Sequence, residues 1–173
     1  HPAEVEWGGL VREMVPCAES VRFTSSGTEA NLMAFRLARA FTKKPKLVRF
    51  ICHFHGWQDH VAFGAKGGAT GGPVPGVLDG IIENVILIEP DNEQLIRETL
   101  SSRDDIAGVI MEPTGASFGG VPVTRDFVAA VRDATTENGV LLMFDEVVTG
   151  FRVSPGGAQA YYGITPDLTS LAK

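Results

Sequence analysis

The sequence has little of what several large classes of protein require. Of its 173 residues, two are cysteine (Cys17 and Cys52) and four are histidine. Two cysteines cannot form a disulfide framework or a four-cysteine zinc site. Lys and Arg number 15 against 21 Asp and Glu, a net charge of −6, so the clustered positive charge that nucleic acids require is missing. We therefore expect no nucleic-acid partner and a reduced, cytoplasmic setting.

Long hydrophobic runs are also missing. No apolar stretch reaches the ~20 residues that a membrane-spanning helix needs, and the opening HPAEVEWGG has no charged-then-apolar signal-peptide order. We therefore expect no membrane partner. The sequence also has no initial methionine and stops directly after Ser-Leu-Ala-Lys, which indicates a piece of a longer chain.

Glycine and proline, in contrast, are plentiful, with 20 and 10 residues. Many of them lie between Gly64 and Gly80. This density predicts a loop without regular structure, and long loops in compact domains often border functional sites.

Short apolar runs alternate with segments of helical periodicity along the chain. Strands are predicted at 21–23, 47–52, 85–88, 106–111 and 140–144. The last three are nearly continuous in apolar side chains, which is typical of strands buried on both faces of a parallel sheet. Helices are predicted at 30–41, 92–101 and from Thr124 to a cap at Gly139. The alternation predicts an α/β fold with a mostly parallel sheet flanked by helices.

Helical spacing also indicates which side chains face the core. In the helix over 30–41 the expected inward residues are Ala30, Met33, Ala34, Leu37, Ala38 and Phe41. In the helix that starts at Thr124 they are Phe127, Ala130, Val131 and Ala134.

Two motifs suggest hydrolases and fail on further inspection. His53 to His60 (HFHGWQDH) resembles a binuclear zinc pattern, but two extra residues precede its Asp and no histidine follows downstream. We therefore expect no metal site, since zinc needs three or four well-placed ligands. Gly115 to Gly119 (GASFG) matches a nucleophile elbow, yet no histidine follows Ser117 to act as its base.

Two nucleotide-binding motifs fail in the same way. Leu141 to Glu146 (LLMFDE) resembles a Walker B strand, but the chain has no phosphate loop of the G-x-x-x-x-G-K-[ST] type. The turn Ser25 to Thr28 has a single glycine, too few for the pyrophosphate of a dinucleotide but adequate for one phosphate.

That turn is the first part of a constellation that does survive. Ser26, Gly27 and Thr28 lie just before a predicted helix. A helix N-terminus offers unpaired N–H groups and the positive end of its dipole, so it can bind a phosphate monoester. The alternative is an ordinary serine or threonine N-cap without a ligand.

An acid and a lysine complete the constellation. Asp145 follows a buried strand, and ligands of open parallel sheets bind beyond the carboxyl ends of the strands. A carboxylate there could pair with a protonated ring nitrogen, and the amine of Lys173 could bond an aldehyde covalently. A phosphate turn, an acid and such a lysine are what pyridoxal phosphate requires.

The sequence resembles the class III (ω-type) pyridoxal-phosphate aminotransferases, in the subgroup that contains glutamate-1-semialdehyde aminomutase. The motifs that carry the resemblance occur in the family's order over nearly the whole chain. They are FTSSGTEAN at 23–31, FHG at 54–56, MEP at 111–113, FDEVVTGFR at 144–152 and TPDLTSLAK at 165–173.

The resemblance implies the large domain of a fold-type I transferase. Residues 1–173 would be part of that cofactor-binding domain, with an N-terminal segment and a C-terminal small domain lying outside this chain. It also implies a homodimer with its site at the subunit interface.

The resemblance further implies a role for each site residue. Ser26, Gly27 and Thr28 would take the cofactor phosphate. Phe54 would stack on one face of the ring and Val147 would close the other. Asp145 would pair with the ring nitrogen, Lys173 would carry the cofactor and then act as the base, and His55 and Glu112 would support the site.

The implied reaction is transfer of an amino group between an amino acid or amine donor and a carbonyl acceptor. One alternative is the intramolecular amino transfer of glutamate-1-semialdehyde aminomutase, which belongs to tetrapyrrole biosynthesis. A lesser alternative is a truncated segment without catalytic activity.

Overall fold

The computed structural model describes residues 1–64, 75–115 and 122–173. In these ranges all the strands form one parallel sheet, in the order β2-β1-β3-β4-β5. Their bounds are β1 (Lys46–Phe50), β2 (Val85–Ile88), β3 (Ile106–Met111), β4 (Leu141–Glu146) and β5 (Leu168–Leu171). The prediction of an α/β fold with a mostly parallel sheet is confirmed.

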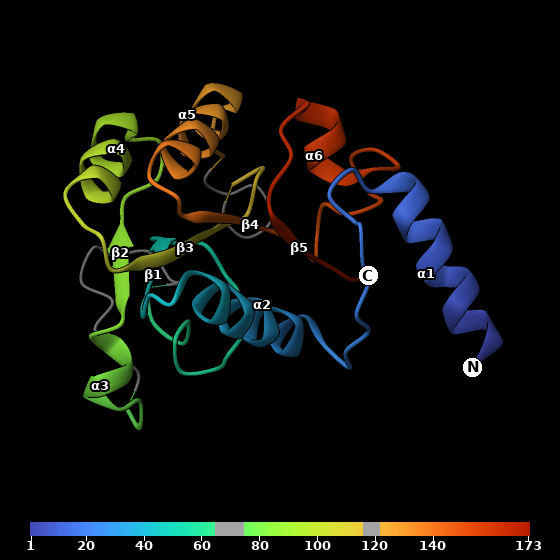
Figure 1. The fold of residues 1–173 in the computed structure, drawn as a ribbon, viewed down its shortest axis with the longest axis horizontal. Helices are drawn as coiled ribbons and strands as arrows, with labels where there is room; N and C mark the ends of the chain where they lie inside the picture. Colours follow the sequence, from blue (N-terminus) through green and yellow to red (C-terminus); the bar gives the residue numbers. More distant parts are fainter. Residues whose placement is uncertain (65–74, 116–121) are drawn as a thin grey trace.

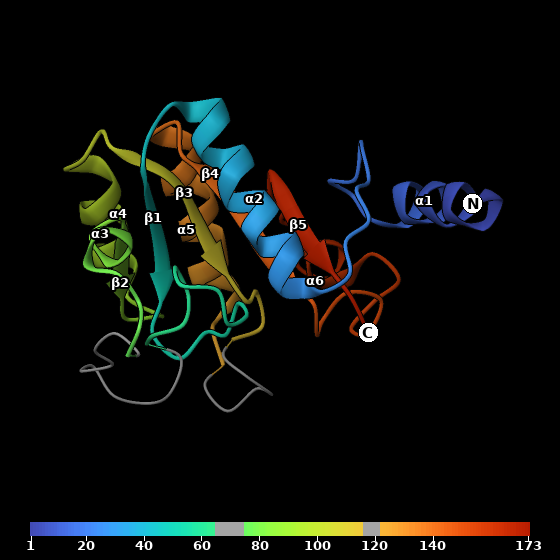
Figure 2. The same ribbon diagram turned by 90° about the horizontal axis from the view of Figure 1, so that it is seen from below.

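Helices cover both faces of this sheet. The helices of the described ranges are α1 (Pro2–Met14), α2 (Gly27–Thr42), α3 (Asp79–Ile82), α4 (Glu93–Ser101), α5 (Arg125–Glu137) and α6 (Gly157–Tyr162). Figures 1 and 2 show α2 on one face and α4 and α5 on the other, while α1 projects away from the body beyond β5. None of the helices in the described ranges is long and apolar enough to cross a membrane.

The larger core lies under α4 and α5. Helix α5 begins where the Thr124 hydroxyl accepts a hydrogen bond from the Phe127 N–H (3.2 Å), and it is followed by Gly139 at a φ of +60°, a conformation that glycine adopts without strain. The four inward residues predicted for this helix are all buried: Phe127, Ala130, Val131 and Ala134.

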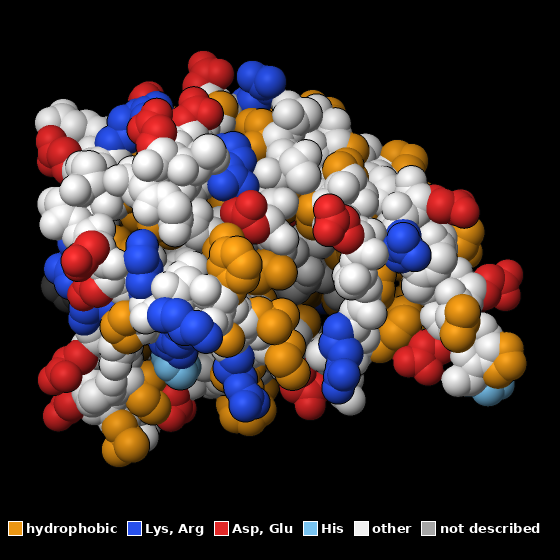
Figure 3. Space-filling model, viewed as in Figure 1, with side chains coloured by type: hydrophobic (Ala, Val, Ile, Leu, Met, Phe, Trp, Pro, Cys, Tyr) orange, Lys and Arg blue, Asp and Glu red, His pale blue; other side chains and the backbone are white. Residues whose placement is uncertain are grey.

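The face that helix α2 presents to the sheet was predicted only in part, since Ala38 is buried as expected. Its buried residues are Asn31, Phe35 and Ala38, whereas Leu37 and Phe41 are 50% and 79% exposed. Figure 3 shows hydrophobic side chains on the outer surface around α2 and along α1. The prediction for Leu37 and Phe41 was wrong because it followed the apolar residues alone, while the packed face includes the polar Asn31.

Further differences between prediction and structure lie near the chain ends. Residues 21–23 are not a strand; the Phe23 ring packs instead against Trp7 of α1, with the ring centroids 4.7 Å apart. Helices α1 and α6 and strand β5 were not predicted. The sequence of β5, Leu-Thr-Ser-Leu, is short and half polar, so it lacks the apolar run that marks the central strands.

The glycine-rich loop was predicted as irregular from Gly64 to Gly80. Residues 65–74 lie outside the described part, but Asp79–Ile82 form the short helix α3, so regular structure begins before the predicted end of the loop. Ser117 also lies outside the described residues.

The orientation of α2 can be tested with two phenylalanines on the same helix. Phe35 is fully buried and Phe41 is 79% exposed. Phe35→Ala should lower the free energy of unfolding by about 3–5 kcal/mol, because it removes buried apolar surface and leaves a cavity. Phe41→Ala should change it by about 0.5 kcal/mol or less. Urea denaturation of the two variants checks this, and equal losses would contradict the orientation.

Candidate functional site

The strand order creates the crevice in which the site residues meet. The chain runs from β1 outward to β2 and then returns to place β3 on the other side of β1. Ligands of open parallel sheets bind at such a reversal, beyond the carboxyl ends of the strands. Phe54 follows β1, Glu112 follows β3 and Asp145 lies near the end of β4, so all three belong to this edge.

Asp145 is the most densely hydrogen-bonded of the predicted residues. Its carboxylate is 5% exposed. Oδ2 accepts hydrogen bonds from Nδ1 of His55 (2.8 Å) and Nδ2 of Asn31 (2.8 Å). Oδ1 accepts longer ones from the Val147 N–H (3.1 Å) and the Ser170 hydroxyl (3.3 Å). Donors from four segments thus replace the water that this buried carboxylate loses.

The segment after β1 is attached to the end of β3 as well. The Phe54 N–H donates to Oε1 of Glu112 (2.6 Å), and the Glu112 N–H donates to Nδ1 of His53 (2.9 Å). The Phe54 side chain itself is 53% exposed. Glu112 therefore holds the backbone at Phe54, and His55, the next residue, is held by its hydrogen bond to Asp145.

His53 is held in its neutral form. Burial, followed by the nearby charges of His55 and Arg49, lowers the pKa of His53 to about 3. The N–H of Glu112 points at its Nδ1, so this nitrogen must act as an acceptor. Both effects disfavour the imidazolium at neutral pH.

Arg49 anchors the far end of the same segment. This β1 side chain is 1% exposed, and its guanidinium donates to the carbonyl oxygens of Val61 and Phe63. It also lies over the Phe63 ring, 5.3 Å from the centroid, an arrangement that favours a cation. Burial lowers the pKa of Arg49 to about 10, which leaves it charged at neutral pH.

The predicted phosphate turn forms the N-terminus of α2. The Ser26 hydroxyl accepts a hydrogen bond from the Glu29 N–H (3.2 Å), and the Glu29 carboxylate accepts one from the Ser25 N–H (2.7 Å). The first bond is the N-cap at Ser26 that the sequence offered as the alternative to a phosphate site, and the helix begins at Gly27 rather than Ala30. The two readings are compatible, since capping leaves other first-turn N–H groups available for an anion.

Two glycines bring this turn against the rest of the site. A Cβ at Gly27 would lie 2.7 Å from Cγ2 of Val147. A Cβ at Gly56, whose φ is +106°, would lie 2.5 Å from Oγ1 of Thr28. No real side chain fits at such distances, so glycine is what allows the turn to touch both the β4 end and the segment after β1.

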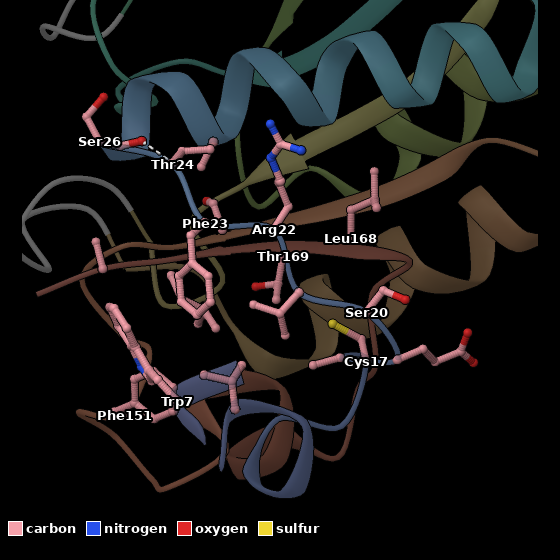
Figure 4. Close-up of a pocket in the computed structure, with 18 of the residues that line it drawn as sticks. Trp7, Cys17, Ser20, Arg22, Phe23, Thr24, Ser26, Phe151, Leu168 and Thr169 are labelled. Carbon is pink, nitrogen blue, oxygen red and sulfur yellow. Dashed lines mark hydrogen bonds between the residues drawn. The ribbon is translucent and has the colours of Figure 1, made fainter. Parts of the chain in front are cut away.

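Lys173 lies beyond the end of β5, next to β4. Ser170 of β5 is in register with Asp145 of β4, and Lys173 follows Ser170 by three residues, two residues beyond the end of β5. Lys173 and Ser26 both line a cavity of about 680 Å³ between α1, the segment before α2 and β5 (Figure 4). Asp145, Phe54 and His55 are not among the described residues that line this cavity. Ser170 connects the cavity to Asp145, because it lines the cavity and its hydroxyl donates to Oδ1 of Asp145.

Sequence reasoning missed two residues of this site. Asn31 was part of a quoted motif but received no role; its signal was a polar residue among the apolar positions of α2. Glu146 is fully buried, and its carboxylate accepts hydrogen bonds from the Ala158 N–H, the Thr149 hydroxyl (2.9 Å) and Nε2 of Gln159 (3.0 Å). It thereby fixes the turn that carries Val147, and the pattern Asp-Glu alone gave no sign of this.

In the described ranges no group of three or more His, Cys, Asp or Glu side chains is arranged to hold a metal ion. Within the motif HFHGWQDH, His53 and His55 are engaged with Glu112 and Asp145 instead.

Comparison with known proteins agrees with this architecture. The glutamate-1-semialdehyde 2,1-aminomutase of Natranaerobius thermophilus is 47% identical over 174 residues, which cover 98% of this chain and 40% of that protein. An ω-transaminase from Sphaerobacter thermophilus has a TM-score of 0.88 at 31% identity, over 99% of this chain and 41% of that chain. A transaminase with PLP bound has a TM-score of 0.90 at 32% identity, over 100% and 41%.

The fold is therefore that of the pyridoxal-phosphate-dependent transferases. More narrowly, residues 3–173 match the family model described as aminotransferase class-III, and the chain belongs to that family. It spans about two fifths of the length of the curated relatives that it matches.

The neutral state of His53 predicts a specific pH dependence of stability. In the unfolded chain a histidine has a pKa of about 6.5, whereas that of folded His53 is about 3. Between these values the unfolded state binds more protons, so the free energy of unfolding should fall as the pH is lowered below about 6.5. His53→Asn keeps an acceptor but cannot titrate, and should flatten this decline in urea denaturation. The exposed His1→Asn serves as the control, and a slope unchanged by His53→Asn would contradict the assignment.

Proposed function

We propose that the chain is the central part of the large cofactor-binding domain of a longer pyridoxal-phosphate enzyme. Residues 1–173 would belong to that domain, with an N-terminal segment and a C-terminal small domain outside this chain. The share of the relatives' length that the chain covers supports this arrangement.

We propose that this enzyme transfers an amino group between an amino acid or amine and a carbonyl acceptor. The observation that carries the proposal is the buried carboxylate of Asp145, fixed at the same sheet edge as the Gly27 turn and Lys173. Such a set fits pyridoxal phosphate, which needs an anion site, a partner for its ring nitrogen and an amine. Membership of the class III family supports the same assignment.

Each residue would have a defined task in that site. The α2 turn at Ser26, Gly27 and Thr28 would hold the phosphate through N–H groups and the helix dipole. Oδ1 of Asp145, whose two hydrogen bonds are the longer ones, would accept a hydrogen bond from the ring nitrogen. A charge-assisted bond of this kind keeps that nitrogen protonated.

Two apolar side chains would enclose the ring. Phe54 is exposed enough to stack on one face, and Val147, held against Gly27, would close the other. Together they would exclude water from the reacting atoms.

When bound, pyridoxal phosphate supplies an electron sink for a substrate carbanion. Lys173 would hold the cofactor through Nζ and, as a free amine once substrate is bound, would move a proton between substrate and cofactor carbons.

The alternative reaction is the intramolecular amino transfer of glutamate-1-semialdehyde aminomutase. The specific observation in its favour is that curated relatives at 42% and 47% identity carry that name, whereas the ω-transaminase structure is 31% identical.

We also propose a cytoplasmic homodimer with the site at the subunit interface, acting on a small-molecule donor and acceptor. Large apolar side chains at the surface support an association: on α1, Val5 and Trp7 are 78% and 58% exposed, and beside the site Trp57 is 79% exposed. Exposed apolar side chains mark contacts between proteins where they lie together in one patch.

Replacing Lys173 tests the cofactor assignment. The full-length enzyme should bind pyridoxal phosphate with a visible absorption band, and borohydride reduction should attach the cofactor to the peptide that contains Lys173. In Lys173→Ala the band and the labelled peptide should both be lost, because the amine that would bond the cofactor is gone. Lys44→Ala is the matched control. A wild-type protein that binds no pyridoxal phosphate would support the non-catalytic alternative.

The acceptor requirement separates the two reactions. With glutamate-1-semialdehyde as the sole substrate, an aminomutase turns over without any added keto acid. An aminotransferase instead stops after one equivalent of amino group per site until a keto acid such as pyruvate or 2-oxoglutarate is added. Product formation with and without the acceptor, followed chromatographically, decides between them.

A further inference from the structure

Helix α2 meets strand β4 and the residue that follows it at regular intervals along their contact. Gly27 abuts Val147, Asn31 bonds Asp145, and Phe35 and Ala38 pack in one cluster with Met143. Four helical residues rise about 6 Å and two strand residues about 6.6 Å. Because these two rises are nearly equal, each turn of α2 faces every second residue of β4.

Asn31 is the polar member of this contact. It is 2% exposed, in a row whose other buried members, Phe35 and Ala38, are apolar. A buried amide costs free energy unless its hydrogens are bonded. Nδ2 of Asn31 donates both to Oδ2 of Asp145 (2.8 Å) and to the carbonyl oxygen of His55 (3.0 Å).

These two bonds connect three parts of the site. Asn31 lies one helical turn after Gly27, so the helix that carries the phosphate turn also carries a donor to the acid. The bond to the His55 carbonyl adds the segment that presents Phe54, and His55 itself donates to the same Asp145 oxygen.

We propose that Asn31 is a positioning residue of the cofactor site. It fixes the carboxylate of Asp145 relative to the phosphate turn, so that the distance between the two cofactor contacts is set by one turn of α2. This inference rests on the proposed function, because the cofactor is what makes that distance matter.

The role predicts what happens when the amide is removed. Without Asn31, Oδ2 of Asp145 keeps only the bond from His55, and the carboxylate can rotate away from the ring nitrogen. The hydrogen bond between His55 and Asp145 should change in the absence of any cofactor, and the affinity for pyridoxal phosphate should fall.

The test uses the full-length enzyme with Asn31→Leu, which keeps the volume, and Asn31→Ser, which is too short to reach both acceptors. Titration of apoprotein with pyridoxal phosphate should give a Kd about 10- to 100-fold higher, the range expected for one lost hydrogen bond to a charged group. The absorption maximum of the bound cofactor should shift, and in apoprotein the downfield ¹H signal of His55 Nδ1–H should move.

The matched control is Asn138→Leu. Asn138 also donates its amide to a carbonyl oxygen at the end of a helix, that of Ala134 (2.8 Å), but it is remote from Asp145. It should leave the Kd, the absorption maximum and the His55 signal unchanged.

Each outcome decides the matter. A folded Asn31 variant with the wild-type Kd, absorption maximum and His55 signal would overturn the proposal. So would the failure of both variants to fold, judged by circular dichroism, because Asn31 would then be needed for folding rather than for positioning. If wild-type protein binds no pyridoxal phosphate, the proposed function fails, while the His55 signal in apoprotein still reports separately on the link between Asn31 and Asp145.

Discussion

The burial of the Asp145 carboxylate is the constraint around which this part of the molecule is organised. A carboxylate removed from water needs donors, since an unpaired one would neutralise or destabilise the fold. Here the donors come from α2, from the segment after β1, from the turn after β4 and from β5. Satisfying one side chain therefore fixes the relative positions of four chain segments that lie far apart in the sequence.

Further hydrogen bonds around Asp145 hold the same segments in place. Glu146, next in the chain, anchors the turn after β4 through α6. Glu112 and His53 join the end of β3 to the segment after β1, and Arg49 holds the far end of that segment. Such fixed segments suit a ligand that is contacted at several points, because the protein side chains need little reorganisation when the ligand binds.

Much of the fold was predictable because its signals are local. The apolar runs at 106–111 and 140–144 mark buried parallel strands, and Thr124 and Gly139 mark the limits of α5. The candidate site residues were predicted from motifs, since Asp145 and the Ser26 turn occupy positions that parallel sheets use for ligands. The inward position of Asn31 in α2 was not predictable from periodicity, because its hydrogen-bond partner, Asp145, lies 114 residues away. Strand β5 was missed for a similar reason: its four residues form a strand through pairing with β4, and their own sequence does not require one.

The contact between Gly27 and Val147 has a consequence for how this sequence can change over time. Because a Cβ at position 27 would fall 2.7 Å from the Val147 side chain, the two positions cannot vary independently. An alanine at 27 becomes compatible only where position 147 loses bulk, and a larger residue at 147 demands that 27 stay glycine. Two positions 120 residues apart in the chain should therefore covary among related sequences, as a record of how closely the helix approaches the strand end.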